Sequence, residues 1–166
     1  MTINLPTSRR TTVLTLGAES AGVFAVYHNG SIFMSKNFGD ILVNTKFLRY
    51  KRAVLAHLAK EKIKPNVIIT DLHPLYNSSI FGEELAKKYS TFGGSAVGGK
   101  ITKLIKVQHH IAHIFSSVGD RLLLSTINYQ LPTSFIGIAA DGTGYGLDGN
   151  IWGGEVFKSQ MSNVKK

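Results

Sequence analysis

The chain has 166 residues, a length that suits one ordinary domain or part of a larger one. Hydrophobic residues make up 43% and charged residues 17% of the chain, and this balance excludes a disordered tail. The absence of cysteine excludes disulfides, thiolate zinc sites and cysteine nucleophiles. No apolar run reaches the roughly 18 residues of a membrane span. We therefore expect a cytoplasmic protein that makes no membrane contact.

The chain is basic, with 19 Lys and Arg against 10 Asp and Glu, for a net charge of +9. Such a charge suits nucleic acid, nucleotide phosphates or an acidic partner protein. However, the cations between residues 46 and 60 are interleaved with residues at core-facing positions. This pattern favours a solvated helix face over a groove-binding patch, so nucleic acid is the less favoured partner.

The first third of the chain predicts three antiparallel strands over residues 12–16, 23–27 and 32–38. Asn29-Gly30 stands between the second and third apolar runs, and this dipeptide is the strongest short signal for a hairpin. A helix follows, with Asn44 or Thr45 as its N-cap and Pro65 at its end. Residues 67–70 form a continuous apolar run that is typical of a strand buried on both faces.

The remaining chain alternates helices and strands. We expect a helix that opens at Ser78 or Ser79, a strand over 101–107, a helix over 109–124, a buried strand over 134–140 and a last strand over 151–157. This order resembles a ribonuclease H-like, actin-like ATPase lobe: an α/β fold whose mixed sheet has three antiparallel strands and then alternating helices and parallel strands. The expected domains are an N-terminal extension (1–11), a single lobe (12–157) and a loose basic tail (158–166).

The strongest local feature is a cluster of histidines near the start of the third helix. His109 and His113 are four residues apart, so they share one helix face and can chelate a transition metal. His110 is expected to point elsewhere. Asp141 follows a predicted strand, where α/β sheets place ligand-binding groups, and it could complete the site. A structural interpretation without metal is also open: the histidines would be polar residues at a helix N-terminus, and Asp141 would start an Asx-turn.

Two other segments offer polar groups at strand ends. Asp71 and His73 follow a buried strand and could bind substrate, or they could be a helix cap and an ordinary loop residue. Residues 16–22 join the first two strands and contain Gly17, Ala18 and Glu19. Backbone N–H groups in such a turn approach phosphates in actin-like ATPases, although a plain β-turn fits the same residues.

Four segments together resemble one family, the carbamoyltransferase module of the HypF hydrogenase-maturation proteins. They are Leu16-Gly17-Ala18-Glu19, Asp71-Leu72-His73-Pro74 with Tyr76, Val107-Gln108-His109-His110-Ile111-Ala112-His113-Ile114, and Asp141-Gly142-Thr143-Gly144-Tyr145-Gly146 running on to Trp152-Gly153-Gly154-Glu155. The segments occur in the family's order and at about its spacing. The resemblance covers residues 12–157.

The resemblance implies an activity and a set of site residues. HypF makes carbamoyl-adenylate from carbamoyl phosphate and ATP, and transfers the carbamoyl group to a C-terminal Cys of HypE for the cyanide ligands of nickel–iron hydrogenases. By resemblance, His109, His113 and Asp141 hold a divalent transition metal, Fe or Zn. Asp71 and His73 would be catalytic residues near the same cleft. The cofactor-binding residues would be Gly17, Ala18, Glu19, Gly142, Thr143 and Gly144.

The resemblance also sets expectations about partners. It assigns the chain to the first of the module's two actin-like halves, so ATP or carbamoyl-adenylate would bind only together with the missing lobe. We expect self-association or a complementary second lobe, an HypE-like acceptor protein, and no turnover by the chain alone. The alternative is a non-catalytic binding remnant that docks a maturation partner or nucleic acid.

Overall fold

The computed structural model describes residues 1–5, 10–91, 101–124 and 134–160. The chain divides into two compact units, Met1–Lys106 and Val107–Lys166, where the sequence predicted a single lobe over residues 12–157. The described part of the predicted basic tail, residues 158–160, belongs to a strand, and residues 161–166 lie outside the described part. Among the described residues, no helix is long and apolar enough to cross a membrane.

The first unit is built on a six-stranded sheet in the order β1-β4-β3-β2-β5-β6. The strands are β1 (Thr2–Asn4), β2 (Val13–Leu16), β3 (Phe24–His28), β4 (Ser31–Met34), β5 (Val67–Asp71) and β6 (Lys103–Val107). Strands β2, β3 and β4 pair antiparallel, and β5 pairs parallel to β2. The predicted mixed sheet is therefore confirmed. The short strand β1, inside the predicted extension, pairs with β4 and was not predicted.

The predicted hairpin between β3 and β4 is confirmed. Asn29 and Gly30 both have positive φ, at 48° and 83°, as a two-residue turn of the primed type requires. The strand β4 ends at Met34, four residues earlier than the apolar pattern predicted.

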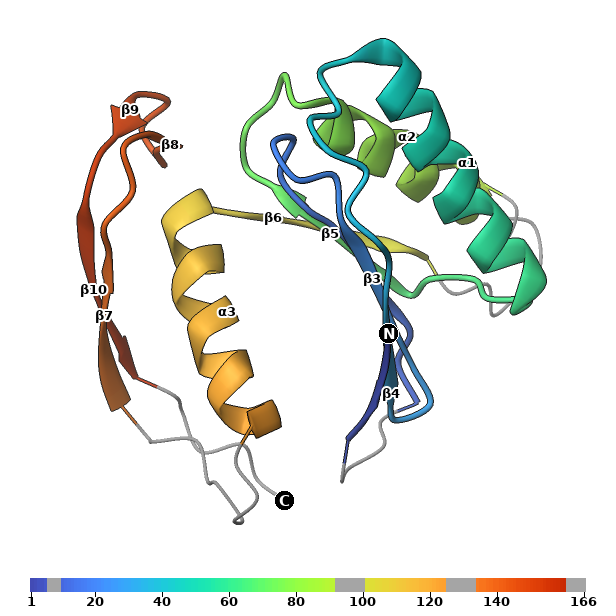
Figure 1. The fold of residues 1–166 in the computed structure, drawn as a ribbon, viewed down its shortest axis with the longest axis horizontal. Helices are drawn as coiled ribbons and strands as arrows, with labels where there is room; N and C mark the ends of the chain where they lie inside the picture. The colour runs from blue at the N-terminus through green and yellow to red at the C-terminus, as the bar shows by residue number, and fades with distance from the viewer. Residues whose placement is uncertain (6–9, 92–100, 125–133, 161–166) are drawn as a thin grey trace. The chain divides into compact units, whose positions relative to one another are not determined.

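Two helices cover one face of this sheet, α1 (Asn44–Lys60) and α2 (Asn77–Thr91) (Figure 1). The N-cap of α1 is Val43, without a side-chain hydrogen bond, so the prediction of Asn44 or Thr45 as the cap was wrong. The helix ends at Lys60 because Lys62 turns to a left-handed φ of 53° and the Ile63 N–H bonds to the Leu58 carbonyl. Pro65 lies beyond that turn. Tyr50, Val54, Leu58, Phe81 and Leu85 pack against the buried side chains of β2, β3 and β5.

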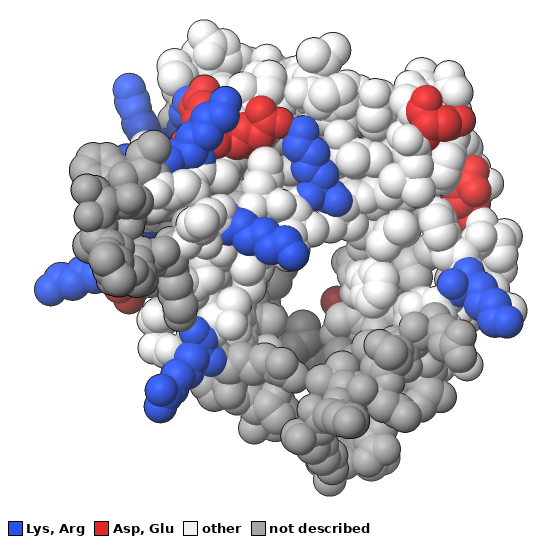
Figure 2. All heavy atoms as spheres, turned by 180° about the vertical axis from the view of Figure 1, so that it is seen from behind, with Lys and Arg blue, Asp and Glu red and all other residues white. Residues whose placement is uncertain are grey.

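The cations of α1 belong to its solvated face, as predicted. Arg49, Arg52 and Lys60 are exposed, and the Lys51 ammonium pairs with the Glu84 carboxylate at 3.0 Å. On the face of the molecule shown in Figure 2, basic side chains stand apart from one another and acidic side chains lie beside some of them.

The second unit contains one helix, α3 (His109–Leu124), and two small antiparallel sheets. Strand β7 (Ser134–Ala139) pairs with β10 (Glu155–Gln160), and β8 (Gly144–Tyr145) pairs with β9 (Ile151–Trp152). The bounds of α3 match the predicted helix. Gly137 lets β7 approach α3 closely, since a Cβ there would lie 2.6 Å from the Ile114 side chain.

Strand β7 differs from its prediction. It was expected to be buried, but Ile136 and Ile138 are 71% and 74% exposed, so only one of its faces is covered. It also pairs within its own two-stranded sheet rather than with the six-stranded sheet of the first unit. The predicted last strand over 151–157 is two strands, β9 and β10, and β10 runs on to Gln160.

Candidate metal centre

Helix α3 begins with a side-chain cap from the residue before it. Gln108 is buried, and its Oε1 accepts a hydrogen bond from the Ile111 N–H at 2.9 Å. Its main-chain carbonyl accepts from the Ala112 N–H at 3.1 Å. The first bond satisfies an amide that has no partner inside the first turn of a helix, and the second is the first regular backbone bond of α3. They also fix where the helix starts, and therefore where the following histidines point.

His109 and His113 lie on the same face of α3, as their spacing predicted. Their rings meet edge to face with centroids 4.8 Å apart, and their Nε2 atoms are separated by 3.2 Å. The His109 side chain is 16% exposed and that of His113 is 59% exposed. A metal ion in solution can therefore reach both rings without unfolding the helix.

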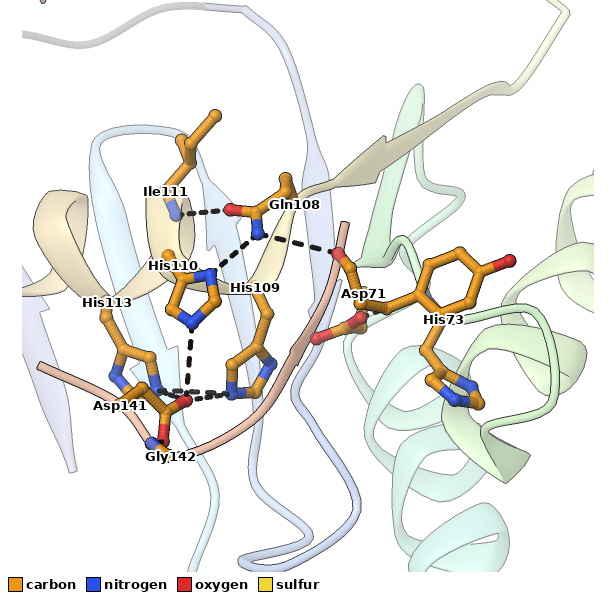
Figure 3. Close-up of polar contacts among 10 residues, drawn as sticks. Asp71, His73, Gln108, His109, His110, Ile111, His113, Asp141 and Gly142 are labelled. Carbon is orange, nitrogen blue, oxygen red and sulfur yellow. Dashed lines mark hydrogen bonds and ion pairs between the residues drawn. The ribbon is translucent and has the colours of Figure 1, made fainter. Parts of the chain in front are cut away.

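Asp141 joins this pair from the segment that follows β7. Its Oδ1 accepts a hydrogen bond from the Gly142 N–H at 2.7 Å, and the backbone N–H of Thr143 also bonds to the carboxyl, as in the Asx-turn that the sequence offered as an alternative. Its Oδ2 lies 3.2 Å from His109 Nε2 and 3.6 Å from His113 Nε2 (Figure 3). Asp141 therefore takes part in both arrangements: Oδ1 bonds to the backbone of the turn, and Oδ2 faces His109 and His113.

The pKa of the Asp141 carboxyl is lowered overall. Desolvation raises the pKa, but the Gly142 hydrogen bond and the nearby His109 and His113 lower it by more. The ionised form that is favoured is the form that ligates metals.

The three ligand atoms fit a metal ion by geometry as well as by chemistry. A tetrahedral zinc ion with bonds of roughly 2.0–2.2 Å holds its ligand atoms about 3.3 Å apart. The separations between the two Nε2 atoms and Oδ2 are 3.2, 3.2 and 3.6 Å. Two imidazoles and a carboxylate suit Zn(II) and Fe(II) alike, and among the described residues these three side chains are the ones that converge.

A recess of about 220 Å³ lies directly beside the cluster. Its wall includes His113 and Asp141, together with Ile114, Ser117, Ile138, Ala139 and Ala140. A small polar molecule in this recess would touch the ligand side chains.

Gly144 has a structural role in this unit. A Cβ at Gly144 would collide with the ring of His110, which is fully buried. Gly142 and Thr143 are exposed. The sequence assigned these three residues to cofactor binding, and that assignment stays a prediction.

The remaining predicted site residues belong to the first unit. Asp71 ends β5, and its Oδ1 accepts a hydrogen bond from the His73 N–H at 2.8 Å. The His73 ring stacks on Tyr76, with centroids 4.1 Å apart, and its Nδ1 accepts from the Leu75 N–H. These contacts organise the loop between β5 and α2. The proposed closeness of Asp71 and His73 to the histidine cluster stays a prediction.

The turn after β2 is also organised by internal contacts. The Gly17 N–H bonds to the Val23 carbonyl at 3.0 Å, and a Cβ at Gly17 would lie 2.8 Å from that oxygen. Glu19 is buried, and its carboxylate accepts the N–H of Asn77 at the start of α2. The predicted cofactor contacts of Gly17, Ala18 and Glu19 stay predictions.

Sequence reasoning missed the role of two residues, Gln108 and His110. His110 is not one of the three clustered ligand residues, as expected, but its buried ring brings Nε2 to 4.0 Å from Asp141 Oδ2. The available signal was the residue before the helix: a glutamine at that position can cap the helix and contact a neighbouring histidine at the same time.

Comparison with known proteins extends the resemblance seen in the sequence. Residues 8–120 match the model of the HypF Kae1-like domain, and residues 137–166 match the second subdomain of the carbamoyltransferase Kae1-like domain. The second match extends the sequence-based expectation, which assigned the chain to the first half alone. His109 and His113 lie in the first matched segment and Asp141 in the second.

Curated relatives and solved structures agree with this match. The chain is 31% identical to the probable carbamoyltransferase HypF of Methanocaldococcus jannaschii, over 87% of this chain and 17% of the relative. It is 32% identical to the carbamoyltransferase HypF of a Synechocystis species, over 94% of this chain and 18% of the relative.

Two crystal structures resemble the fold over nearly the whole chain. Full-length HypF in its phosphate- and nucleotide-bound form matches with a TM-score of 0.71 and 26% identity, over 96% of this chain and 18% of that one. HypF of T. kodakarensis matches with a TM-score of 0.67 and 33% identity, over 95% of this chain and 18% of that one. The chain thus spans less than a fifth of the length of these relatives. With a family model matched over more than half of its residues, the chain belongs to the HypF Kae1-like domain family.

Proposed function

We propose that this chain is the metal-binding part of an HypF-type carbamoyltransferase that acts in the maturation of nickel–iron hydrogenases. The observation that carries the proposal is the convergence of His109, His113 and Asp141 in a chain of this family. These residues would hold one divalent transition metal, Fe or Zn. When bound, such a metal acts as a Lewis acid that polarises the carbamoyl group of carbamoyl-adenylate.

The residues around the cluster give the site its shape. Helix α3 fixes the two imidazoles, and the Gly142 N–H holds one oxygen of Asp141 so that the other faces them. The recess beside His113 and Asp141 would receive the carbamoyl end of the substrate. The exposed His113 side chain leaves the cluster accessible to the group that accepts the carbamoyl unit.

We further propose that turnover needs segments outside this chain. The matched HypF relatives are more than five times longer than the aligned region. A complementary lobe, or a second copy of the chain, would surround ATP or carbamoyl-adenylate, and an HypE-like protein would be the acceptor. Alone, the chain is expected to bind metal without transferring carbamoyl groups. A complementary lobe, added as a separate polypeptide, should then make transfer measurable.

The metal site is tested by stoichiometry. Purified wild-type chain is loaded anaerobically with Fe(II) or Zn(II), desalted and analysed for bound metal, next to the His113→Ala variant. The control is His57→Phe, which removes a histidine that stacks on Phe33 and is not in the cluster. We expect about one metal per chain in the wild type and the control, and none in His113→Ala. A wild-type chain that retains no metal contradicts the proposal and favours the non-catalytic binding alternative.

A further inference from the structure

His110 is a buried histidine with one ring nitrogen that no hydrogen bond satisfies. Its side chain is 0% exposed, and among the described residues no hydrogen-bond partner reaches its Nε2. Leaving a buried polar group without a partner is costly, and native proteins seldom do so without a reason. The acceptor that this nitrogen faces is Oδ2 of Asp141, 4.0 Å away, the same oxygen that faces His109 and His113.

The other ring nitrogen shows which tautomer His110 adopts. The Gln108 side-chain amide has a fixed orientation, because its Oε1 accepts the Ile111 N–H and its Nε2 donates to the Tyr145 carbonyl at 3.4 Å. The same Nε2 lies 2.8 Å from His110 Nδ1. An amide NH₂ can only donate, so Nδ1 accepts and the ring hydrogen is on Nε2. Figure 3 shows this chain of contacts from Gln108 through His110 to Asp141.

The His110 ring has little freedom to leave this position. Gly144 lies against it so closely that a Cβ would collide with the ring, and the ring itself is fully buried. The His110 ring is therefore held by the Gln108 amide at Nδ1 and by the close approach of Gly144 to Cε1 and both ring nitrogens.

We infer that Gln108 and His110 form a positioning relay in which the Nε2–H of His110, directed at Asp141 Oδ2 from 4.0 Å, attracts the carboxylate and favours its orientation toward His109 and His113. This inference rests on the proposed metal site and adds residues that are not themselves ligands. The backbone N–H groups of Gly142 and Thr143 already hydrogen-bond to the Asp141 carboxylate, and the relay adds a donor on the side of the histidines. Partners that orient a metal ligand in this way typically change metal affinity by roughly 10–100-fold when they are removed.

The first measurement concerns the tautomer and needs no metal. Nitrogen-15 NMR of the metal-free 166-residue chain should show His110 protonated at Nε2 and unprotonated at Nδ1. In Gln108→Glu, a carboxylate replaces the amide and faces Nδ1, so the ring hydrogen should move to Nδ1. In Asp141→Ala, the His110 Nε2–H signal should shift or exchange faster with water. An Nδ1-protonated wild type, or a His110 signal indifferent to both substitutions, overturns the relay.

The second measurement is Zn(II) affinity, determined by competition with a chromophoric chelator. His110→Leu removes the donor and should weaken binding roughly 10–100-fold. His110→Gln places an amide nitrogen near the position of Nε2 and should recover most of that loss, which a merely space-filling role would not predict. Gln108→Glu should also weaken binding, and it keeps the test decisive if His110→Leu fails to fold. Folded variants that bind zinc as tightly as the wild type overturn the inference.

The two proposals fail in distinguishable ways. If the wild type binds no zinc, the metal site is wrong, while the tautomer and its response to Asp141→Ala still decide whether the contact from His110 to Asp141 exists. If the wild type binds zinc and the His110 variants bind it equally well, the metal site stands and the relay is wrong.

Discussion

The carboxylate of Glu19, in the turn after β2, accepts a hydrogen bond from the backbone N–H of Asn77, the first residue of α2. Glu19 is only 6% exposed, and Asn77 is half-buried. A second contact ties the same two segments to the chain before α1: the Asn77 side chain donates to the Ile41 carbonyl, and the Ile41 N–H donates to the Glu19 carbonyl. Glu19 thus acts as a helix cap supplied from a distant part of the sequence.

Replacing Glu19 should therefore destabilise the first unit. We expect Glu19→Ala to lower the free energy of unfolding by about 1.5–3 kcal/mol, the usual contribution of a hydrogen bond to a charged group. Glu19→Gln keeps an acceptor oxygen and should lose less. Urea unfolding followed by circular dichroism gives these values. Glu61→Ala is the control, because its exposed pair with Lys60 is worth little. If Glu19→Ala unfolds at the wild-type midpoint, the carboxylate is not a cap and its cofactor assignment gains support.

His57 gives the first unit a pH dependence whose sign can be worked out. Burial lowers the pKa of His57, whose ring stacks on Phe33 with centroids 3.9 Å apart, while the charge of Glu61 opposes the shift and that of Lys60 adds to it. The folded state disfavours the charged His57 ring. The contribution of the neutral His57 ring to stability is therefore complete above its unfolded pKa of about 6.5, and it is lost as the pH falls through the lowered pKa of the folded state.

The substitution that isolates this effect is His57→Phe, which keeps a ring against Phe33 and cannot be protonated. The melting temperature of the variant minus that of the wild type should rise as the pH is lowered from about 7.5 to about 5. Other titrating groups are common to both proteins and cancel in the difference. A difference that stays constant over this range would show that protonation of His57 is not linked to unfolding.

Local patterns in the sequence predicted the parts of this protein that depend on neighbouring residues. The bounds of α3, the shared face of His109 and His113, and the Asn29-Gly30 turn follow from helical spacing and turn chemistry. Asp141 could also be predicted, because residues at the ends of strands often take part in binding sites.

The features that the sequence did not predict depend on partners that are distant or unrecognised. An apolar run such as that of β7 does not tell whether one or both faces of a strand are covered, so Ile136 and Ile138 were wrongly expected to be buried. Strand β1 has three residues and exists only because the edge of β4 accepts it. The orientation of His110 depends on Gln108, Tyr145 and Gly144, and two of these lie more than 30 residues away.

The last prediction separates a structural from a ligand-binding role for Gly144. An alanine there would place its Cβ 2.8 Å from His110 Nε2 and 3.0 Å from Nδ1, inside ordinary contact distance of a ring that cannot move outward. Overpacking of this kind costs about 1–3 kcal/mol. Urea unfolding followed by the fluorescence of Trp152, the single tryptophan, reports on this unit.

Gly142→Ala is the matched control, because a Cβ at Gly142 meets nothing within 4 Å. It should unfold within about 0.5 kcal/mol of the wild type, as surface substitutions usually do, whereas Gly144→Ala should unfold at clearly lower urea. Equal stability of the two variants would mean that His110 can yield to the added methyl group. In that case the glycine is not needed for packing, and its assignment to cofactor binding becomes the better explanation for a glycine at this position.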